Sequence, residues 1–306
     1  MKLVTAFFRL IRWQNLIFIV ITQLLFYFCV YQPLYSSNEN LHQLTWLIIA
    51  SVFIAAAGYI INDYFDLNID QINKPSQNVI NKLISRRWAI FWHMSLSIAG
   101  IGATGIAVGF QKWYLIVANV VVVILLWLYS TSFKRQLLIG NIVISLLTAW
   151  TVLILFFAKV PFASAFGTTD PVTVKFFRIS FLYAGFAFII SLIREAIKDV
   201  EDMEGDRRYG CKTLPIIAGI VATKVYTTVW VVVLMAALII LQLYILQFGW
   251  WWAVVYGVLV VIAPLCYLFR KHYAAHTTKE FTDLSRLAKW IMLTGILSML
   301  FFRYYF

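Results

Sequence analysis

Two short acidic stretches of this 306-residue chain carry aspartates at one repeated spacing. The stretch "INDYFDLNID" (61–70) has Asp at positions 63, 66 and 70, and "IKDVEDMEGD" (197–206) has Asp 136 residues later, at 199, 202 and 206. Together with Glu195, the two stretches hold nine of the 13 acidic residues of the chain. On a continuous helix, offsets of 0, +3 and +7 fall within about 60° of one another. We therefore expect each set of aspartates to share one helix face.

Carboxylates crowded on one face repel one another unless positive charge lies among them. Oxygen donors of this kind suit Mg²⁺, which binds through a few carboxylates and completes its shell with substrate phosphate. Asn62, Asp66 and Asp70 form a comparable stripe at i, i+4 and i+8. Two such clusters facing each other predict a diphosphate held between magnesium ions. Helix capping with interfacial solvation is the alternative interpretation.

Several basic residues lie close enough in sequence to hold diphosphate oxygens. Lys198 stands inside the second acidic stretch, where a lone cation is unusual. Lys134 and Arg135 lie in the short segment "STSFKRQ", and Lys74 follows Asp70 by four residues. Lys134, Arg135 and Lys74 have an equally good alternative explanation, because basic residues collect on one side of a membrane whether or not they bind a ligand.

The rest of the chain is strongly apolar, with 62% hydrophobic residues, 12% charged residues and a mean hydropathy of +0.85. Nine apolar runs approach the roughly 20 residues that cross a bilayer as a helix. They are Trp13–Tyr31, Leu44–Ile61, Trp88–Phe110, Trp113–Ser130, Leu137–Phe157, Phe176–Ile193, Ile217–Gln247, Trp250–Phe269 and Leu287–Phe306. The runs lack the alternation of a membrane barrel. We predict an all-α polytopic protein with one integral-membrane domain over residues 1–306.

The basic residues predict the orientation of these spans. With the N-terminus in the cytoplasm, 18 of the 25 Lys and Arg residues fall in cytoplasmic segments and 5 on the opposite side. Both acidic stretches then lie on the cytoplasmic side. The net charge of +12 is explained by topology, and we expect no nucleic-acid partner.

The acidic stretches follow the second and the sixth apolar run. This order predicts two four-helix units that cross the membrane in the same direction, plus one further helix. A site between duplicated halves is a common arrangement in membrane proteins.

Other motifs carry weaker signals. "DLNID" (66–70) begins like a calcium loop, but Gln71 stands where that loop needs Gly and Gln77 where it needs Glu. Three scattered cysteines and four dispersed histidines predict neither a disulfide framework nor a zinc site.

The acidic motifs resemble those of the UbiA-type superfamily of intramembrane prenyltransferases. Its first signature, N-x-x-x-D-x-x-x-D, is matched by Asn62, Asp66 and Asp70, and its second, D-x-x-x-D, by Asp202 and Asp206, with Glu195 as the preceding acidic residue. Within the superfamily, "NDYFDLNIDQINKP" and "REAIKDVEDMEGDRRYGCKTLPI" look most like the ether-lipid branch. That branch transfers a geranylgeranyl group to geranylgeranylglyceryl phosphate.

The resemblance implies that Mg²⁺ binds a prenyl diphosphate donor, whose prenyl group moves to a lipophilic acceptor in the bilayer. The implied metal ligands are Asn62, Asp63, Asp66, Asp70, Glu195, Asp199, Asp202 and Asp206. The implied catalytic residues are Asp66, Asp70, Asp202, Asp206 and Lys198. The implied diphosphate-binding residues are Lys134, Arg135, Lys74, Tyr129 and Arg194.

One departure concerns the loop after "NKP", where many members have Arg-Pro and this chain has Gln77 and Asn78. Either Arg86 or Arg87 replaces that arginine, or the donor binds differently there. Two rival hypotheses stay open, and a third is excluded. An aromatic acceptor could take the prenyl group, and a cation-coupled transporter could use the same carboxylates. CDP-alcohol phosphotransferases also use clustered aspartates, but their D-G-x-x-A-R motif does not occur here.

Overall fold

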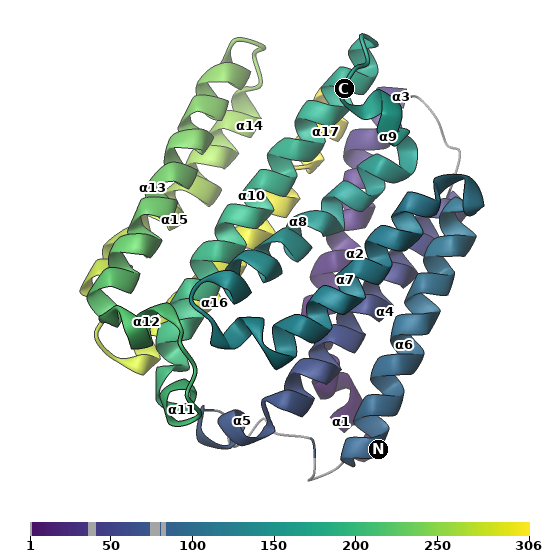
Figure 1. The fold of residues 1–306 in the computed structure, drawn as a ribbon. Helices are drawn as coiled ribbons and strands as arrows, with labels where there is room; N and C mark the ends of the chain where they lie inside the picture. The colour runs from purple at the N-terminus through teal and green to yellow at the C-terminus, as the bar shows by residue number, and fades with distance from the viewer. Residues whose placement is uncertain (1, 36–40, 74–79, 81–83) are drawn as a thin grey trace.

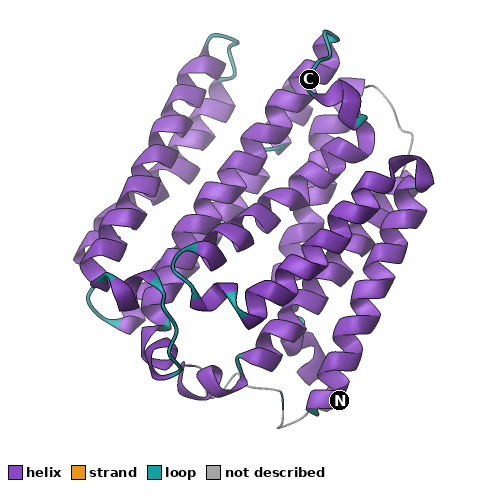
Figure 2. Ribbon diagram, viewed as in Figure 1, coloured by secondary structure: helices purple, strands orange, loops and turns teal. Residues whose placement is uncertain are grey.

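The computed structural model describes residues 2–35, 41–73, 80 and 84–306. These residues form helices joined by short loops and turns, and none of them belongs to a β-strand (Figure 2). Most of the long helices run side by side from one end of the molecule to the other (Figure 1).

Nine helical segments of the described chain are long and apolar enough to cross a membrane, as the sequence predicts. The first combines α2 (Trp13–Leu25), the π-helical turn η1 (Phe26–Tyr31) and α3 (Gln32–Tyr35). The next six are α4 (Leu41–Phe65), α6 (Arg86–Val108), η2 (Phe110–Lys112) with α7 (Trp113–Thr131), α8 (Ile139–Lys159), α10 (Pro171–Glu201) and α13 (Gly219–Leu246). The eighth joins α14 (Trp251–Tyr256), η4 (Gly257–Ile262) and α15 (Ala263–Ala274), and the ninth joins α16 (Thr278–Leu297) and α17 (Leu300–Tyr305).

Short helices connect these spans or precede them. They are α1 (Lys2–Leu10), α5 (Leu67–Asn73), η3 (Phe133–Arg135), α9 (Phe162–Ala165), α11 (Met203–Arg208) and α12 (Leu214–Ile217). Helices α1, α5, α11 and α12 all lie at the end of the molecule where the chain starts (Figure 1).

Two helices extend well beyond the apolar runs that predict them. Helix α10 continues past Ile193 to Glu201 because Arg194, Glu195 and Lys198 are polar but are good helix formers. Helix α16 begins at Thr278, nine residues before the predicted run. Thr277 and Glu280 form a capping box that fixes this start. Hydropathy reports the apolar part of a helix and misses a polar extension of this kind.

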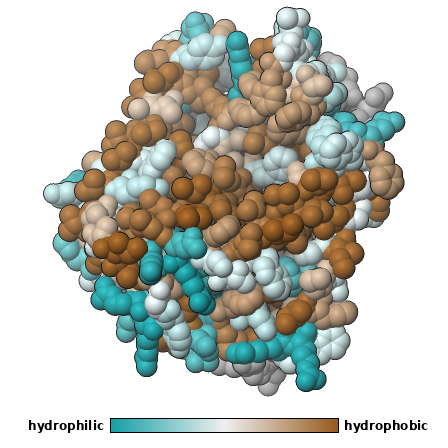
Figure 3. Space-filling model, in the orientation of Figure 1, coloured by the Kyte–Doolittle hydropathy of each residue, from teal (hydrophilic) through white to brown (hydrophobic). Residues whose placement is uncertain are grey.

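The outer surface carries the apolar side chains that a membrane requires. Val221, Ile240 and Leu243 of α13 are 77%, 67% and 66% exposed. Hydrophobic residues form a broad band across the middle of the molecule, and hydrophilic residues gather toward the end near α11 and α5 (Figure 3). Such exposure is stable in lipid, where helices satisfy their own backbone hydrogen bonds.

Helices α4 and α10 occupy equivalent central places. Helix α4 packs against α2, α6 and α7, and helix α10 packs against α8, α13 and α16. Helix α4 forms the second span and α10 the sixth, and the partner α16 belongs to the ninth span, outside the predicted second unit. An aromatic cluster that includes Phe156 and Phe176, with ring centroids 5.4 Å apart, fixes α10 against α8.

Both acidic stretches contain a helix break at the same point of the repeat. Helix α4 ends at Phe65 and α5 begins at Leu67, so Asp66 lies at the junction. Helix α10 ends at Glu201 and α11 begins at Met203, so Asp202 lies at the second junction, with φ −93° and ψ 4°. The expectation that each aspartate set lies on one continuous helix was therefore wrong. The middle aspartate of each set lies at a bend, and the outer two lie on different helices.

Candidate active site

The two acidic segments meet although they are 136 residues apart in sequence. Helix α5 packs against α11, and the side chain of Asn73 joins them. Its Nδ2 donates to the carbonyl oxygen of Asp202 at 2.9 Å, and its Oδ1 accepts from the backbone N–H of Gly205 at 2.9 Å. A Cβ atom on Gly205 would lie 2.6 Å from the Asn73 amide. Glycine therefore permits this close approach.

Asp66 forms an ion pair with Lys134, which lies on η3 between α7 and α8. Both side chains are largely buried, 14% and 11% exposed respectively. The start of helix α8 lies close to this turn. A Cβ atom added to Gly140 would lie only 2.8 Å from the Cα of Lys134. The backbone N–H of Lys212 donates to the carbonyl of Arg135 at 2.7 Å. The η3 turn thus contacts the first acidic segment and the chain that follows the second.

Asp63 has a different partner. Arg12 Nη2 lies 2.6 Å from Asp63 Oδ1, and the guanidinium carbon lies 5.3 Å from the centroid of the Tyr59 ring. Arg12 has φ 50° and ψ 51°, a left-handed conformation at the turn between α1 and α2. The carboxylate of Asp63 raises the pKa of the Arg12 guanidinium further above its ordinary value. Arg12 therefore keeps its charge at every accessible pH.

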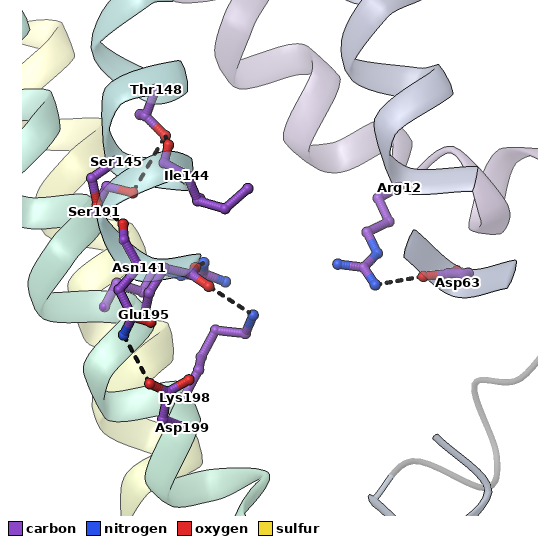
Figure 4. A network of polar contacts seen from close by, with 11 residues as sticks. Arg12, Asp63, Asn141, Ile144, Ser145, Thr148, Ser191, Glu195, Lys198 and Asp199 are labelled. Carbon is purple, nitrogen blue, oxygen red and sulfur yellow. Dashed lines mark hydrogen bonds and ion pairs between the residues drawn. The ribbon is translucent and has the colours of Figure 1, made fainter. Parts of the chain in front are cut away.

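A third group of polar contacts lies on α10 and α8. Glu195 accepts from Arg194 Nη1 at 2.8 Å and from Lys198 Nζ at 3.3 Å. Asn141 Nδ2 of α8 donates to Asp199 Oδ2 at 2.8 Å. Figure 4 shows this group on one side of the view, with Arg12 and Asp63 on the other. The Lys198 and Arg12 side chains point toward each other.

Asp206 of α11 is an acidic residue whose surroundings disfavour its negative charge. Its pKa is raised to about 7 by burial and by the nearby carboxylates of Asp202 and Asp66, while Lys134 and Lys198 act in the opposite direction. The electrostatic coupling to Asp66 links the first acidic segment to the second. A carboxyl group in this environment holds its proton unless positive charge is added.

The donor set suits a hard divalent cation. The Oδ1 atom of Asn62 is buried and accepts no hydrogen bond from the described residues, and its neighbours Asp63 and Asp66 carry carboxylate oxygens that could bind a metal. Among the described residues, however, no three Asp, Glu, His or Cys side chains gather closely enough to hold a metal ion. Arg12, Lys134 and the α10 cations supply the positive charge among the carboxylates here. The chemistry of the donors fits Mg²⁺, and their arrangement in the described chain is not that of a closed metal site.

The remaining predicted site residues divide into those near these carboxylates and those away from them. Tyr129 lies within electrostatic range of Asp66, Glu195 and Asp199. Lys74, with the loop that carries Gln77 and Asn78, lies outside the described residues. Arg86 lies over the Tyr64 ring, 6.0 Å from its centroid, and Arg87 is exposed.

Sequence reasoning missed three residues of the site, namely Arg12, Asn73 and Asn141. Arg12 was counted only as a cytoplasmic charge, and a basic residue before a first span carries no further signal. Asn73 and Asn141 act through side-chain amides in the strings "INKP" and "IGN". The position of "GN" after Lys134 was the one available pointer to Asn141.

Comparison with known proteins identifies the family of the chain. A family model described as the UbiA prenyltransferase family matches residues 20–293. A digeranylgeranylglyceryl phosphate synthase of Haloquadratum walsbyi is 33% identical over 225 residues, which cover 73% of this chain and 71% of the relative. Another, from Methanosphaera stadtmanae, is 26% identical over 252 residues, which cover 82% of this chain and 84% of the relative.

Solved structures share the fold. A structure reported for digeranylgeranylglyceryl phosphate synthase in membranes aligns with a TM-score of 0.61 and 24% identity, over 98% of this chain and 99% of that one. A UbiA homolog from Archaeoglobus fulgidus, bound to DMAPP and Mg²⁺, aligns with a TM-score of 0.60 and 17% identity, over 96% of this chain and 99% of that one. With nine apolar helices, the chain is an integral multi-pass membrane protein. It belongs to the UbiA prenyltransferase family.

Proposed function

We propose that this chain, acting as one membrane domain over residues 1–306, transfers a geranylgeranyl group from its diphosphate to geranylgeranylglyceryl phosphate. The observation that carries the proposal is the contact between the two acidic segments, which Asn73 makes with Asp202 and Gly205. Lys134, which forms an ion pair with Asp66, adds a positive charge at the same place. Carboxylates and cations gathered in this way are suited to an anionic leaving group.

The chain's own residues bind and orient the donor. Lys134, Arg135 and Lys198 contribute positive charge for the diphosphate oxygens, with Tyr129 and Arg194 nearby and Lys74 assigned from the sequence. The residues assigned to hold magnesium are Asn62, Asp63, Asp66, Asp70, Glu195, Asp199, Asp202 and Asp206. When bound, Mg²⁺ supplies Lewis-acid stabilisation of the departing diphosphate. The ion pairs of Lys134 with Asp66 and of Lys198 with Glu195 hold both ammonium groups beside the acidic residues.

The transfer breaks one bond and makes one. The bond between the allylic carbon and the diphosphate oxygen breaks with its electron pair staying on the diphosphate. The acceptor hydroxyl oxygen then bonds to that carbon and loses its proton. Water competes with the acceptor, so the surrounding apolar helices have to exclude it. The ionisation step is the one in which we assign catalytic roles, to Asp66, Asp70, Asp202, Asp206 and Lys198.

Two observations support the proposed acceptor, geranylgeranylglyceryl phosphate, and the proposed cytoplasmic location of the site. Relatives that match most of this chain are named digeranylgeranylglyceryl phosphate synthase. The basic residues of the sequence favour a cytoplasmic location for the end that carries α1, α5 and α11.

The test uses purified protein in lipid nanodiscs with Mg²⁺, labelled geranylgeranyl diphosphate and a panel of acceptors. We expect transfer to geranylgeranylglyceryl phosphate, and a loss of at least about 100-fold in Asp66→Asn and Asp202→Asn. Glu201→Gln, which changes a carboxylate without a place in the proposed site, serves as the matched control. Transfer to 4-hydroxybenzoate but not to the glycerol lipid would replace the acceptor assignment. Donor binding without product from any acceptor would favour a transporter.

A further inference from the structure

A cavity of about 160 Å³ lies at the end of the molecule opposite the candidate active site. Helices α3 and α9, which carry part of its lining, are at the top of Figure 1, and α5 and α11 are at the bottom. Its lining includes six residues with polar side chains, namely Tyr31, Tyr35, Lys159, Ser164, Thr168 and Thr173. A hollow with several polar groups around it is the usual form of a ligand site. The proposed transfer uses none of these six residues.

Lys159 supplies the positive charge of this cavity. It is the last residue of α8, a position where a cation usually interacts with the carbonyl groups at the helix end. Here Lys112 takes that role, because its Nζ donates to the carbonyl oxygen of Ala158. The Nζ of Lys159 lies instead 4.6 Å from the centroid of the Tyr31 ring. The ring face holds the ammonium group at the cavity wall.

The hydroxyl groups of the wall form an ordered set of donors and acceptors. Thr173 Oγ1 donates to Asp170 Oδ2 at 2.6 Å. The Tyr35 hydroxyl lies 3.2 Å from Thr173 Oγ1 and therefore donates to it. Thr168 Oγ1 accepts from the backbone N–H of Asp170 at 3.2 Å, and its own O–H makes no hydrogen bond with a described residue. The wall thus presents an ammonium group and a hydroxyl donor.

Asp170 is the acidic residue that these contacts bring to the wall. Its Oδ2 accepts from the backbone N–H and from the hydroxyl of Thr173, at 2.8 and 2.6 Å. The carboxylate is therefore directed to the N-terminus of α10, where the helix dipole stabilises a negative charge. Glu39, which is near Tyr35 in the sequence, lies outside the described residues. The argument for a ligand rests on the donors at the wall and not on a count of charges.

Two exposed aromatic rings lie beside the cavity. Phe162 and Phe166 are 58% and 64% exposed, and their ring centroids are 5.8 Å apart. They flank Ser164, which lines the cavity, in the segment between α8 and α10. Exposed aromatic residues at the ends of membrane spans lie at the level of the lipid headgroups. Polar donors and an apolar surface are therefore next to each other at that level.

We infer that this cavity binds the phosphate group of a membrane phospholipid, in the leaflet opposite the candidate active site. Lys159 and the Thr168 hydroxyl donate to the phosphate oxygens, and the first of these contacts is charge-assisted. The acyl chains then lie over Phe162 and Phe166. Because the lining comes from the first span, α8 and α10, a bound phospholipid links these three elements. The inference does not depend on the proposed function.

The experiment measures lipid binding to delipidated protein in detergent by native mass spectrometry, without prenyl diphosphate. The probes are dioleoylphosphatidylglycerol, dioleoylglycerol, which lacks the phosphate, and inorganic phosphate. We expect Lys159→Met to weaken binding of the phospholipid about 10- to 100-fold, and Thr168→Val to weaken it about fivefold. Lys159→Arg keeps the charge and should bind as the parent does. Arg178→Met, an exposed position near the start of α10, is the control and should also bind as the parent does.

The inference is overturned if Lys159→Met binds the phospholipid as tightly as the parent, or if the parent binds dioleoylglycerol equally well. Inorganic phosphate that binds as tightly as the phospholipid would show a site for free phosphate and would refute the lipid. Should Lys159→Met fail to fold, Thr168→Val decides, because its hydroxyl lies in a loop. Weaker binding than in Arg178→Met then supports the site, and equal binding refutes it. A failure of prenyl transfer changes none of these results.

Discussion

The side-chain amide of Asn73 and the backbone of Gly205 are in contact across the two halves of the chain, with Asn73 Oδ1 2.9 Å from Gly205 N. The same amide donates to the carbonyl of Asp202. One neutral side chain therefore sets the spacing between two acidic segments. An acidic residue at this position would add to the repulsion between the carboxylates, and a basic residue would neutralise one of the proposed metal ligands. The neutral amide of Asn73 does neither.

Replacing this contact is expected to weaken catalysis without unfolding the protein. Asn73→Ala removes two hydrogen bonds, worth about 1 to 3 kcal/mol together, and frees α5 from α11. We expect kcat/KM to fall about tenfold or more and the Mg²⁺ concentration for half-maximal rate to rise. Steady-state assays over a magnesium titration measure both.

Gly205→Ala is expected to act in the same direction, because its methyl group would displace the Asn73 amide. Gly102→Ala is the matched control, since a Cβ there meets no atom within 4 Å. Equal activity of the Gly205 and Gly102 variants would show that the spacing between α5 and α11 is not set by this contact.

The ion pair between Lys134 and Asp66 leads to a second prediction. Lys134→Met leaves a largely buried carboxylate near Asp206 without its cation, at a cost of the order of 3 kcal/mol. We expect a lower melting temperature without metal and a turnover about 100-fold lower. Added Mg²⁺ should raise the melting temperature of this variant more than that of the parent, because the metal replaces the lost charge. Lys212→Met, at an exposed position, should behave as the parent in both measurements. A variant that magnesium does not stabilise beyond the parent contradicts this account.

Asp206 predicts a pH dependence of magnesium binding. Because burial raises its pKa to about 7, the metal-free protein binds a proton there below neutral pH, and magnesium has to displace that proton. Apparent Mg²⁺ affinity should therefore fall as pH decreases from 8 to 6, by up to about tenfold per unit below the pKa. Calorimetry in two buffers of different ionisation enthalpy measures the released proton. In Asp206→Asn the affinity should be lower and nearly independent of pH. A flat profile in the parent would remove Asp206 from the metal ligands.

Gly140 predicts an effect on the η3 turn. A methyl group at this position would press on the Cα of Lys134 and on the carbonyl oxygen of Phe133, 3.1 Å away. Gly140→Ala should therefore move Lys134 off Asp66 and lower kcat at least about tenfold. Gly185→Ala, which has open space around its Cβ, should have no effect on kcat. Full activity of the Gly140 variant would mean that the η3 turn adapts without moving Lys134.

The spans were predictable because lipid allows little choice of structure. Long apolar runs become helices, and all nine coincide with a helix of the structure. Their ends were less predictable. Residues 194–201 continue α10 although they are polar, and neither break, at Asp66 or at Asp202, is marked by a Gly or Pro. The breaks follow from tertiary contacts that no local pattern contains.

The candidate site was also predictable only in part. The repeated carboxylates and Lys134 stood out because charge is rare in this chain. Arg12 did not, because a cation near a span end fits topology as well as function. Its partner, Asp63, lies 51 residues away. Such a pair becomes visible only when the helices are placed in space.

The matched breaks at Asp66 and Asp202 have a consequence for biosynthesis. Three of the nine clustered acidic residues are synthesised with the first four spans, and the other six follow more than a hundred residues later. Arg12 and Lys134, the partners of Asp63 and Asp66, are both synthesised before α11. A nascent chain that stops before α11 therefore has these ion pairs but lacks Asp206 and the contact between α5 and α11.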